Sequence, residues 1–255
     1  MLDQSPRERM FNVPAVVTGL LAVLAIVHAV STLLLTPEQY DAFLWLFAFI
    51  PARYDASVTT DVAWSGGVGA DIWTFVTYAL VHANLTHLVV NGVWLLAFCS
   101  PLARRFGPLR FLAFMAATAA AGAFAHLVTH IGALVPIVGA SASISGAMAA
   151  AMRFAFQPGG FLGGARDGEE AHRIPALSLA ACLREPRVIV FLLVWFGVNA
   201  LFGFISLDGA GMDQPLAWQA HIGGFMAGLL TFSFFDPVPM SATAGHDTDP
   251  ASTIH

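Results

Sequence analysis

Long stretches without charged residues alternate with shorter polar segments along the chain. Residues 10–37, 72–103 and 111–152 contain no Asp, Glu, Lys or Arg, and neither do residues 188–207 and 214–235. A helix of about 20 apolar residues crosses a lipid bilayer, and the longest stretch has room for two helices joined by a turn. The pattern predicts an all-α membrane protein, a six-transmembrane-helix bundle. The expected spans cover residues 13–35, 78–99, 109–129, 140–156, 187–206 and 217–236.

The composition agrees with a membrane location. Hydrophobic residues make up 57% of the chain and charged residues 11%, whereas soluble domains average about 25% charged residues. The first apolar run, residues 13–35, is longer than the roughly 7–15 residues of a cleavable signal sequence. We therefore expect a multi-pass integral membrane protein with the lipid bilayer as its surroundings and no nucleic-acid partner. A bacterial inner (plasma) membrane is the expected location, since no transit-peptide composition precedes the first span.

The arginines predict an orientation. All 11 basic residues are Arg, and in a six-span arrangement every one except Arg53 falls on the same side of the membrane. Basic residues favour the cytoplasmic side, so both termini are expected to be cytoplasmic. The expected divisions are a cytoplasmic tail at residues 1–12, a membrane domain at 13–236 with an external membrane-associated loop at 36–71 and a cytoplasmic loop at 158–186, and a disordered tail at 237–255.

Polar side chains in three of the spans indicate a functional site. Spans 78–99, 140–156 and 217–236 run in the same direction, and each carries polar residues near its outer end. Such groups are costly inside a membrane and are therefore functional candidates. Ser141 lies in the first turn of its helix, where free N–H groups favour negative charge. His221 is the candidate base that would accept the serine proton.

Two glycines favour a close approach between the helices that carry this pair. Gly224 and Gly228 share a helical face with His221, and the span that begins near Ser141 is rich in alanine. The imidazole is therefore expected to reach the Ser141 hydroxyl. The alternative interpretations are that the serines are small residues that permit tight helix packing, and that His221 only hydrogen-bonds a loop.

Two hydrogen-bond donors in the second span complete the candidate site. His87 and Asn91 are four residues apart and share a helical face, so both can donate hydrogen bonds to an oxyanion. His82 lies about 140° around the same helix and is expected to face water or an outer loop. The H-E-x-x-H motif of zinc proteases is absent, and the span cores contain no carboxylate. No metal and no cofactor are therefore expected.

Three sequence blocks resemble the rhomboid family of intramembrane serine proteases. They are WTFVTYALVHANLTHLVVN (Trp73–Asn91), PIVGASASISGAM (Pro136–Met148) and AHIGGFMAG (Ala220–Gly228), and they occur in the order and in the spans typical of the family. The resemblance implies a rhomboid-like bundle with Ser141 as the nucleophile and His221 as the general base. It further implies an oxyanion site formed by His87, Asn91 and the Ser141 N–H, with His82 at the active-site mouth.

Two positions depart from the family pattern. Ala142 replaces the last glycine of the G-x-S-G motif, and Ser145 replaces an aromatic residue that often packs on the base histidine.

With no acid available as a third member, a Ser-His dyad is expected. The expected function is an intramembrane serine endopeptidase that cleaves single-span transmembrane substrates near the outer membrane face. The alternatives are a catalytically inactive rhomboid-like protein that binds transmembrane clients, and a small transporter or channel, which would require mid-membrane ionisable residues that the sequence lacks.

Overall fold

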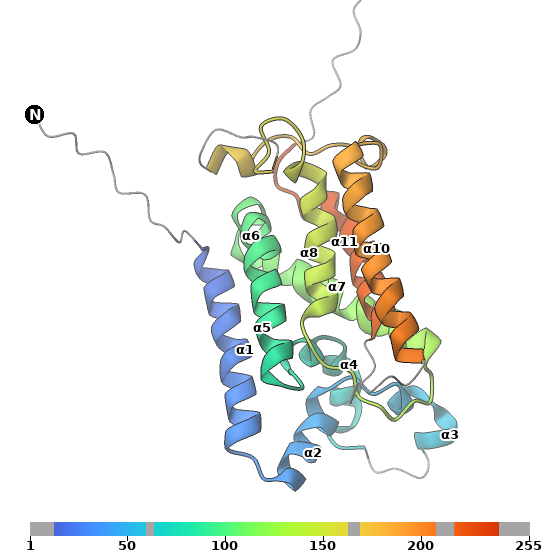
Figure 1. The fold of residues 1–255 in the computed structure, drawn as a ribbon. Helices are drawn as coiled ribbons and strands as arrows, with labels where there is room; N and C mark the ends of the chain where they lie inside the picture. Colours follow the sequence, from blue (N-terminus) through green and yellow to red (C-terminus); the bar gives the residue numbers. More distant parts are fainter. Residues whose placement is uncertain (1–12, 60–63, 163–168, 208–216, 240–255) are drawn as a thin grey trace, which may run out of the picture.

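The computed structural model of the protein is a bundle of helices (Figure 1). It describes residues 13–59, 64–162, 169–207 and 217–239. Within these ranges the only extended pairing is an isolated antiparallel bridge between Phe49 and Ile137, so the all-α prediction is confirmed. The tail expected at residues 1–12 and most of the tail expected at residues 237–255 lie outside the described residues.

The chain forms eleven α-helices over the residues that the structure describes, together with short turns of other helix types. The α-helices are α1 (Ala15–Leu33), α2 (Pro37–Phe47), α3 (Ala56–Thr59), α4 (Gly67–Thr77), α5 (Leu85–Trp94), α6 (Ser100–Phe106), α7 (Pro108–Thr129), α8 (Ser141–Ala155), α9 (Leu179–Cys182), α10 (Pro186–Leu207) and α11 (Trp218–Phe235). The turns are 3-10 helices at Pro51–Tyr54, Tyr78–Leu80 and Glu169–His172, and a π-helical turn at Leu95–Cys99 that joins α5 to α6.

Three helical segments of the described chain are long and apolar enough to cross a membrane. They are α1, the continuous segment Leu85–Phe106 and α7, and α10 contributes a shorter apolar helix. The span predicted at residues 78–99 begins late, because Asn84 caps α5 by accepting a hydrogen bond from the His87 N–H at 2.8 Å. The residues before this cap form a 3-10 turn instead. Apolar character predicted a span here, but the cap decides where its helix begins.

Arg53 holds together the segment between α1 and α5. In the predicted orientation, Arg53 lies on the opposite side of the membrane from the other arginines. It is only 4% exposed. Its guanidinium donates to the carbonyl groups of Trp45 and Ser65 and lies 3.3 Å from an Asp71 carboxylate oxygen. Because the Arg53 charge is paired within this segment, we infer that Arg53 orders the segment. It is not expected to determine the orientation of the chain in the membrane.

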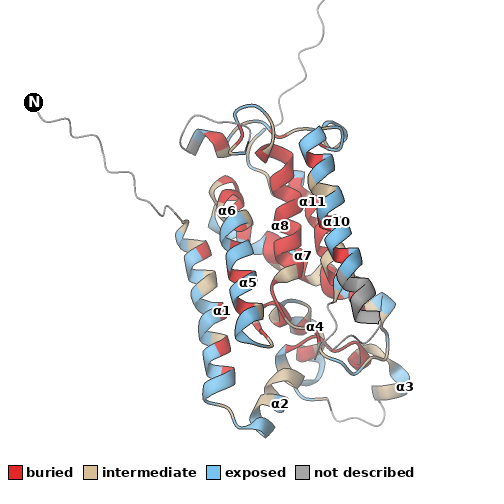
Figure 2. Cartoon of the chain, in the orientation of Figure 1, coloured by how far each residue is buried: buried red, intermediate tan, exposed pale blue. Residues whose placement is uncertain are grey.

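Helix α8 forms the centre of the bundle. Every residue from Ala142 to Ala155 is buried, and Figure 2 shows α8 as a continuously buried helix, whereas α1 and α10 carry many exposed positions. Exposed apolar side chains on such outer helices suit contact with lipid. The buried surface of α8 is lined by small residues, so neighbouring helices can approach its backbone closely.

Helices α8 and α11 touch through their main chains. A Cβ atom added to Gly224 would overlap the carbonyl oxygen of Ala142, and one added to Gly228 would overlap the carbonyl oxygen of Gly146. The close approach predicted from the glycine spacing is therefore present. It fixes the separation of the two helices at the ends that carry Ser141 and His221.

A buried ion pair closes the opposite end of the bundle. Arg105 donates from Nε and Nη2 to the two carboxylate oxygens of Asp236, at 2.8 Å each. The side chains are 0% and 4% exposed. Its Nη1 also donates to the carbonyl groups of His172 and Ile174, and the guanidinium lies over the Phe154 ring. This cluster ties α6 and the end of α11 to the loop that follows α8.

We expect Asp236→Asn to lower the stability of the protein by about 3–5 kcal/mol, because Arg105 would remain charged and buried without its carboxylate. Thermal unfolding of the detergent-solubilised protein measures this effect. Glu170→Gln removes an exposed carboxylate from the same loop region and serves as the matched control, with an expected change below about 0.5 kcal/mol. Equal unfolding temperatures for the two variants would contradict the structural importance of the pair.

Candidate active site

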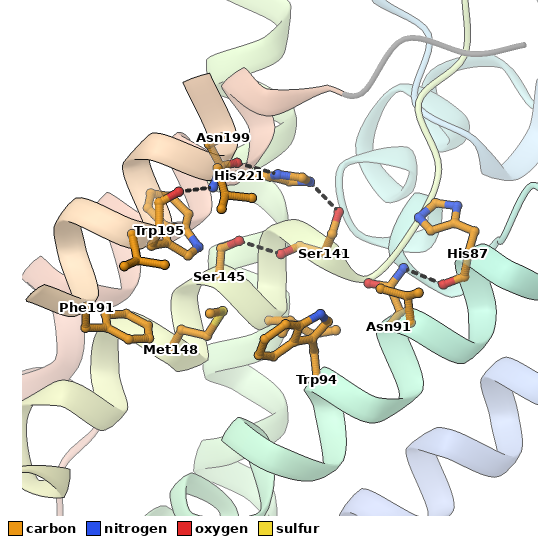
Figure 3. A pocket seen from close by; sticks show the side chains of 14 residues that line it. His87, Asn91, Trp94, Ser141, Ser145, Met148, Phe191, Trp195, Asn199 and His221 are labelled. Atoms are coloured by element: carbon orange, nitrogen blue, oxygen red, sulfur yellow. Dashed lines mark hydrogen bonds between the residues drawn. The ribbon is translucent and has the colours of Figure 1, made fainter. Parts of the chain in front are cut away.

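Four of the predicted site residues line a single cavity. His87 and Asn91 come from α5, Ser141 from the start of α8 and His221 from the first turn of α11 (Figure 3). The cavity has a volume of about 310 Å³. Its walls are otherwise mainly apolar, formed by Val90, Trp94, Ile144, Met148, Phe191, Val194, Trp195 and Val198. It therefore combines a small polar cluster with a surface that suits apolar side chains.

Ser141 and His221 are in hydrogen-bond contact. The Ser141 Oγ lies 2.8 Å from the His221 Nε2. Ser145, one turn further along α8, donates its hydroxyl instead to the Ser141 carbonyl oxygen, also at 2.8 Å. The hydroxyl next to the imidazole is therefore that of Ser141. An imidazole nitrogen at this distance can accept the serine proton when the serine attacks.

The loop before α8 determines where Ser141 lies. Gly139 has a φ of +115°, which favours glycine, and a Cβ atom there would lie 2.6 Å from the His87 Nε2. The Gly139 N–H donates to the Tyr78 carbonyl oxygen at 3.0 Å. This glycine thus lets the chain turn into α8 while the His87 ring packs against its main chain. Ser141 is the first residue of α8, where N–H groups have no partner within the helix.

His87 and Asn91 lie on the α5 side of Ser141, opposite the wall formed by α10 (Figure 3). The Asn91 Nδ2 donates to the His87 carbonyl oxygen at 3.0 Å, which leaves its second amide hydrogen for another acceptor. The two side chains and the start of α8 therefore surround one part of the cavity with hydrogen-bond donors. Such donors stabilise negative charge that develops on a reacting oxygen.

His82 does not lie where the sequence predicted. It precedes α5 rather than forming part of it, and it is fully buried. Its ring meets that of His87 edge-on, with centroids 5.1 Å apart, and its carbonyl oxygen lies 3.2 Å from the His28 Nδ1. The expectation that His82 faces water or an outer loop is wrong, because the helical angle used to place it does not apply before the Asn84 cap. His82 packs behind His87 instead.

Asn199 is the site residue that the sequence reasoning missed. Its Oδ1 lies 2.9 Å from the His221 Nδ1, on the opposite side of the imidazole from Ser141. The sequence carried a signal for it, since Asn199 is a polar side chain within an otherwise apolar predicted span, where polar groups mark functional candidates. The expected dyad rested on the lack of an acid, but an amide oxygen can also accept a hydrogen bond from an imidazole N–H.

Two comparisons with known proteins indicate the family of the chain. The family model for the rhomboid domain matches residues 69–235. The chain is also 33% identical over 108 residues to the protein named "Putative rhomboid protease YdcA" from Bacillus subtilis (strain 168). That match covers 39% of this chain and 54% of the relative, so it spans about half the length of the relative.

The chain belongs to the rhomboid family. Together with the apolar helices, this membership makes it an integral membrane protein. Among the residues that the structure describes, no group of three or more His, Cys, Asp or Glu side chains could hold a metal ion.

Proposed function

We propose that the protein is an intramembrane serine endopeptidase in which Ser141 is the nucleophile and His221 the general base. The observation that carries this proposal is the 2.8 Å contact between the Ser141 Oγ and the His221 Nε2 inside a cavity. A serine hydroxyl is a weak nucleophile until a neighbouring base removes its proton. Membership of the rhomboid family supports the same activity.

The reaction would proceed by acyl transfer. His221 takes the Ser141 proton at Nε2 while the serine oxygen attacks the peptide carbonyl carbon. The negative oxygen of the tetrahedral intermediate accepts hydrogen bonds from the Ser141 N–H, His87 and Asn91. His221 then protonates the leaving amine, and a water molecule, deprotonated by the same imidazole, hydrolyses the acyl-enzyme. Each oxyanion donor of this kind typically contributes on the order of 10²–10³ in rate.

The substrates would be single-span transmembrane proteins. An apolar cavity next to the reacting atoms suits the side chains of a membrane helix, but the scissile peptide must leave its helical conformation to reach Ser141. We further propose six spans, formed by α1, α5–α6, α7, α8, α10 and α11, with both termini cytoplasmic and the site near the outer face of a bacterial inner membrane. The arginine distribution supports this orientation.

A catalytically inactive binder of transmembrane clients is the less favoured candidate. Such a protein has no need of a serine hydroxyl aligned with an imidazole nitrogen, and the chain has that alignment. The Ser–His contact therefore favours the enzyme.

An activity-based probe tests the proposed function directly. We expect a fluorophosphonate to label the purified full-length protein at Ser141, since the probe reacts with a serine that a base activates. Labelling is expected to disappear in Ser141→Ala and in His221→Ala, and to persist in the presence of a chelator. Peptide mapping by mass spectrometry identifies the modified residue. Labelling at Ser145, or undiminished labelling of Ser141→Ala, would refute the assignment.

A further inference from the structure

Helices α10 and α11 meet through two successive side-chain pairs. Trp195 of α10 stacks on Phe225 of α11, with ring centroids 4.2 Å apart. One turn towards the C-terminus of α10 and towards the N-terminus of α11, Asn199 meets His221. Residues four apart share a helical face, so the aromatic pair sets the position of the polar pair. Asn199 is 7% exposed and Phe225 is 1% exposed, which makes this a packed contact rather than a surface one.

A second hydrogen bond fixes which end of the Asn199 amide faces the imidazole. The Nδ2 donates to the Trp195 carbonyl oxygen at 2.8 Å. The reversed amide would place two oxygens against each other there, so the Oδ1 is the atom that faces the His221 Nδ1. A carbonyl oxygen only accepts hydrogen bonds. The Nδ1 must therefore carry the imidazole proton in this contact.

This proton assignment determines the chemistry at the other ring nitrogen. In a neutral imidazole one nitrogen carries hydrogen and the other has a free lone pair. With hydrogen on Nδ1, the lone pair lies on Nε2 and faces the Ser141 hydroxyl. That is the form of histidine that can remove the serine proton. The opposite tautomer would present an N–H to the hydroxyl and could not act as the base.

We infer that Asn199 is a positioning residue that holds His221 in its base-competent tautomer and ring orientation, so that the site works as a Ser–His–Asn arrangement rather than as a dyad. The inference rests on the proposed protease function and extends it to α10. Ser145 does not supply this support, because its hydroxyl is bonded to the Ser141 carbonyl. Among the residues that line the cavity, His87 is the other titratable group, and no carboxylate is present there.

The test compares two substitutions of nearly equal size. Asn199→Leu removes the acceptor, whereas Asn199→Asp keeps an acceptor and adds a negative charge. We expect Asn199→Leu to lower kcat for cleavage of a transmembrane substrate by roughly 10²-fold with little change in KM. Asn199→Asp is expected to restore most of this loss. Leu193→Ala, which changes an exposed side chain on the same helix, serves as the control and is expected to keep wild-type activity.

The pH profile separates positioning from simple structural support. A carboxylate at position 199 favours the protonated imidazole, so more alkaline conditions are needed to free the base. The acid limb of the activity profile of Asn199→Asp is therefore expected to move to higher pH by about one unit or more. A residue that only filled space would not produce this displacement.

The other possible results refute either the positioning role of Asn199 or the protease function on which it rests. If Asn199→Leu cleaves like the wild type while Ser141→Ala is inactive, the positioning role is refuted and the protease proposal stands. The positioning role is also refuted if Asn199→Asp is as inactive as Asn199→Leu at every pH. Continued cleavage by Ser141→Ala would instead remove the proposed function on which the inference rests.

Discussion

Ser141→Ala and His221→Ala are each expected to reduce cleavage of a model transmembrane substrate by on the order of 10⁴–10⁶. The first variant lacks the attacking oxygen, and the second lacks the group that receives its proton. Because the two side chains act as a unit, the double variant is expected to be no less active than either single variant. Cleavage by purified protein in detergent micelles or liposomes measures all three.

Ser143→Ala is the matched control for this experiment. Ser143 lies on the same helix two residues after Ser141, but its hydroxyl donates to the Met115 carbonyl oxygen at 3.0 Å and does not line the cavity. We expect this variant to retain activity. Thermal unfolding of each variant tests whether the inactive proteins remain folded. Cleavage by Ser141→Ala at the rate of the wild-type protein would rule out Ser141 as the nucleophile.

Gly224→Ala is expected to lower activity by about 10²-fold or more and to destabilise the protein by about 1–3 kcal/mol. The added methyl group would overlap the Ala142 carbonyl oxygen, a main-chain atom of a helix that is buried from Ala142 to Ala155. Relief requires α11 to move away from α8, and His221 lies less than one turn from Gly224. The distance between the Ser141 hydroxyl and the imidazole would therefore increase.

Gly19→Ala provides the comparison for this substitution. Gly19 lies within α1, and a Cβ atom there would have no neighbour within 4 Å. The same change of residue is expected to leave activity intact and to affect stability little, since alanine suits a helix at least as well as glycine. Cleavage assays and thermal unfolding of both variants provide the measurement. Unaltered cleavage by Gly224→Ala would show that main-chain contact does not set the geometry of the site.

The sequence predicted the parts of the site that depend on local pattern. Ser141 is a candidate because it lies in the first turn of a predicted helix, where free N–H groups favour negative charge, and the glycines that follow His221 predict a close helix contact. Both features depend on spacing along one helix. The start of α5 could not be predicted from hydropathy, because the Asn84 side chain caps the helix after the 3-10 turn Tyr78–Leu80 has already ended. The misplacement of His82 followed from that boundary.

The role of Asn199 could not be predicted from the sequence for a different reason. Its polar character inside an apolar span was visible, but the direction of its side chain depends on how α10 packs against α11. That packing rests on the stack of Trp195 on Phe225, a contact between residues 30 positions apart in the chain. The hydrogen bond to the Trp195 carbonyl then selects the orientation of the amide. The stack joins two helices and leaves no signal in local spacing.

Because α8 and α11 touch through their main chains, the distance between Ser141 and His221 and the shape of the cavity can change independently. The gap between the proposed nucleophile and base is set where Gly224 meets Ala142 and Gly228 meets Gly146, and within the cavity wall Trp195 and Asn199 support the position of His221. Met148 and Phe191 belong to that wall and lie away from these contacts. Their replacement can reshape the space offered to a substrate while the reacting atoms keep their distance. Evolution of new substrate preferences in this scaffold therefore has a route that leaves the chemical step untouched.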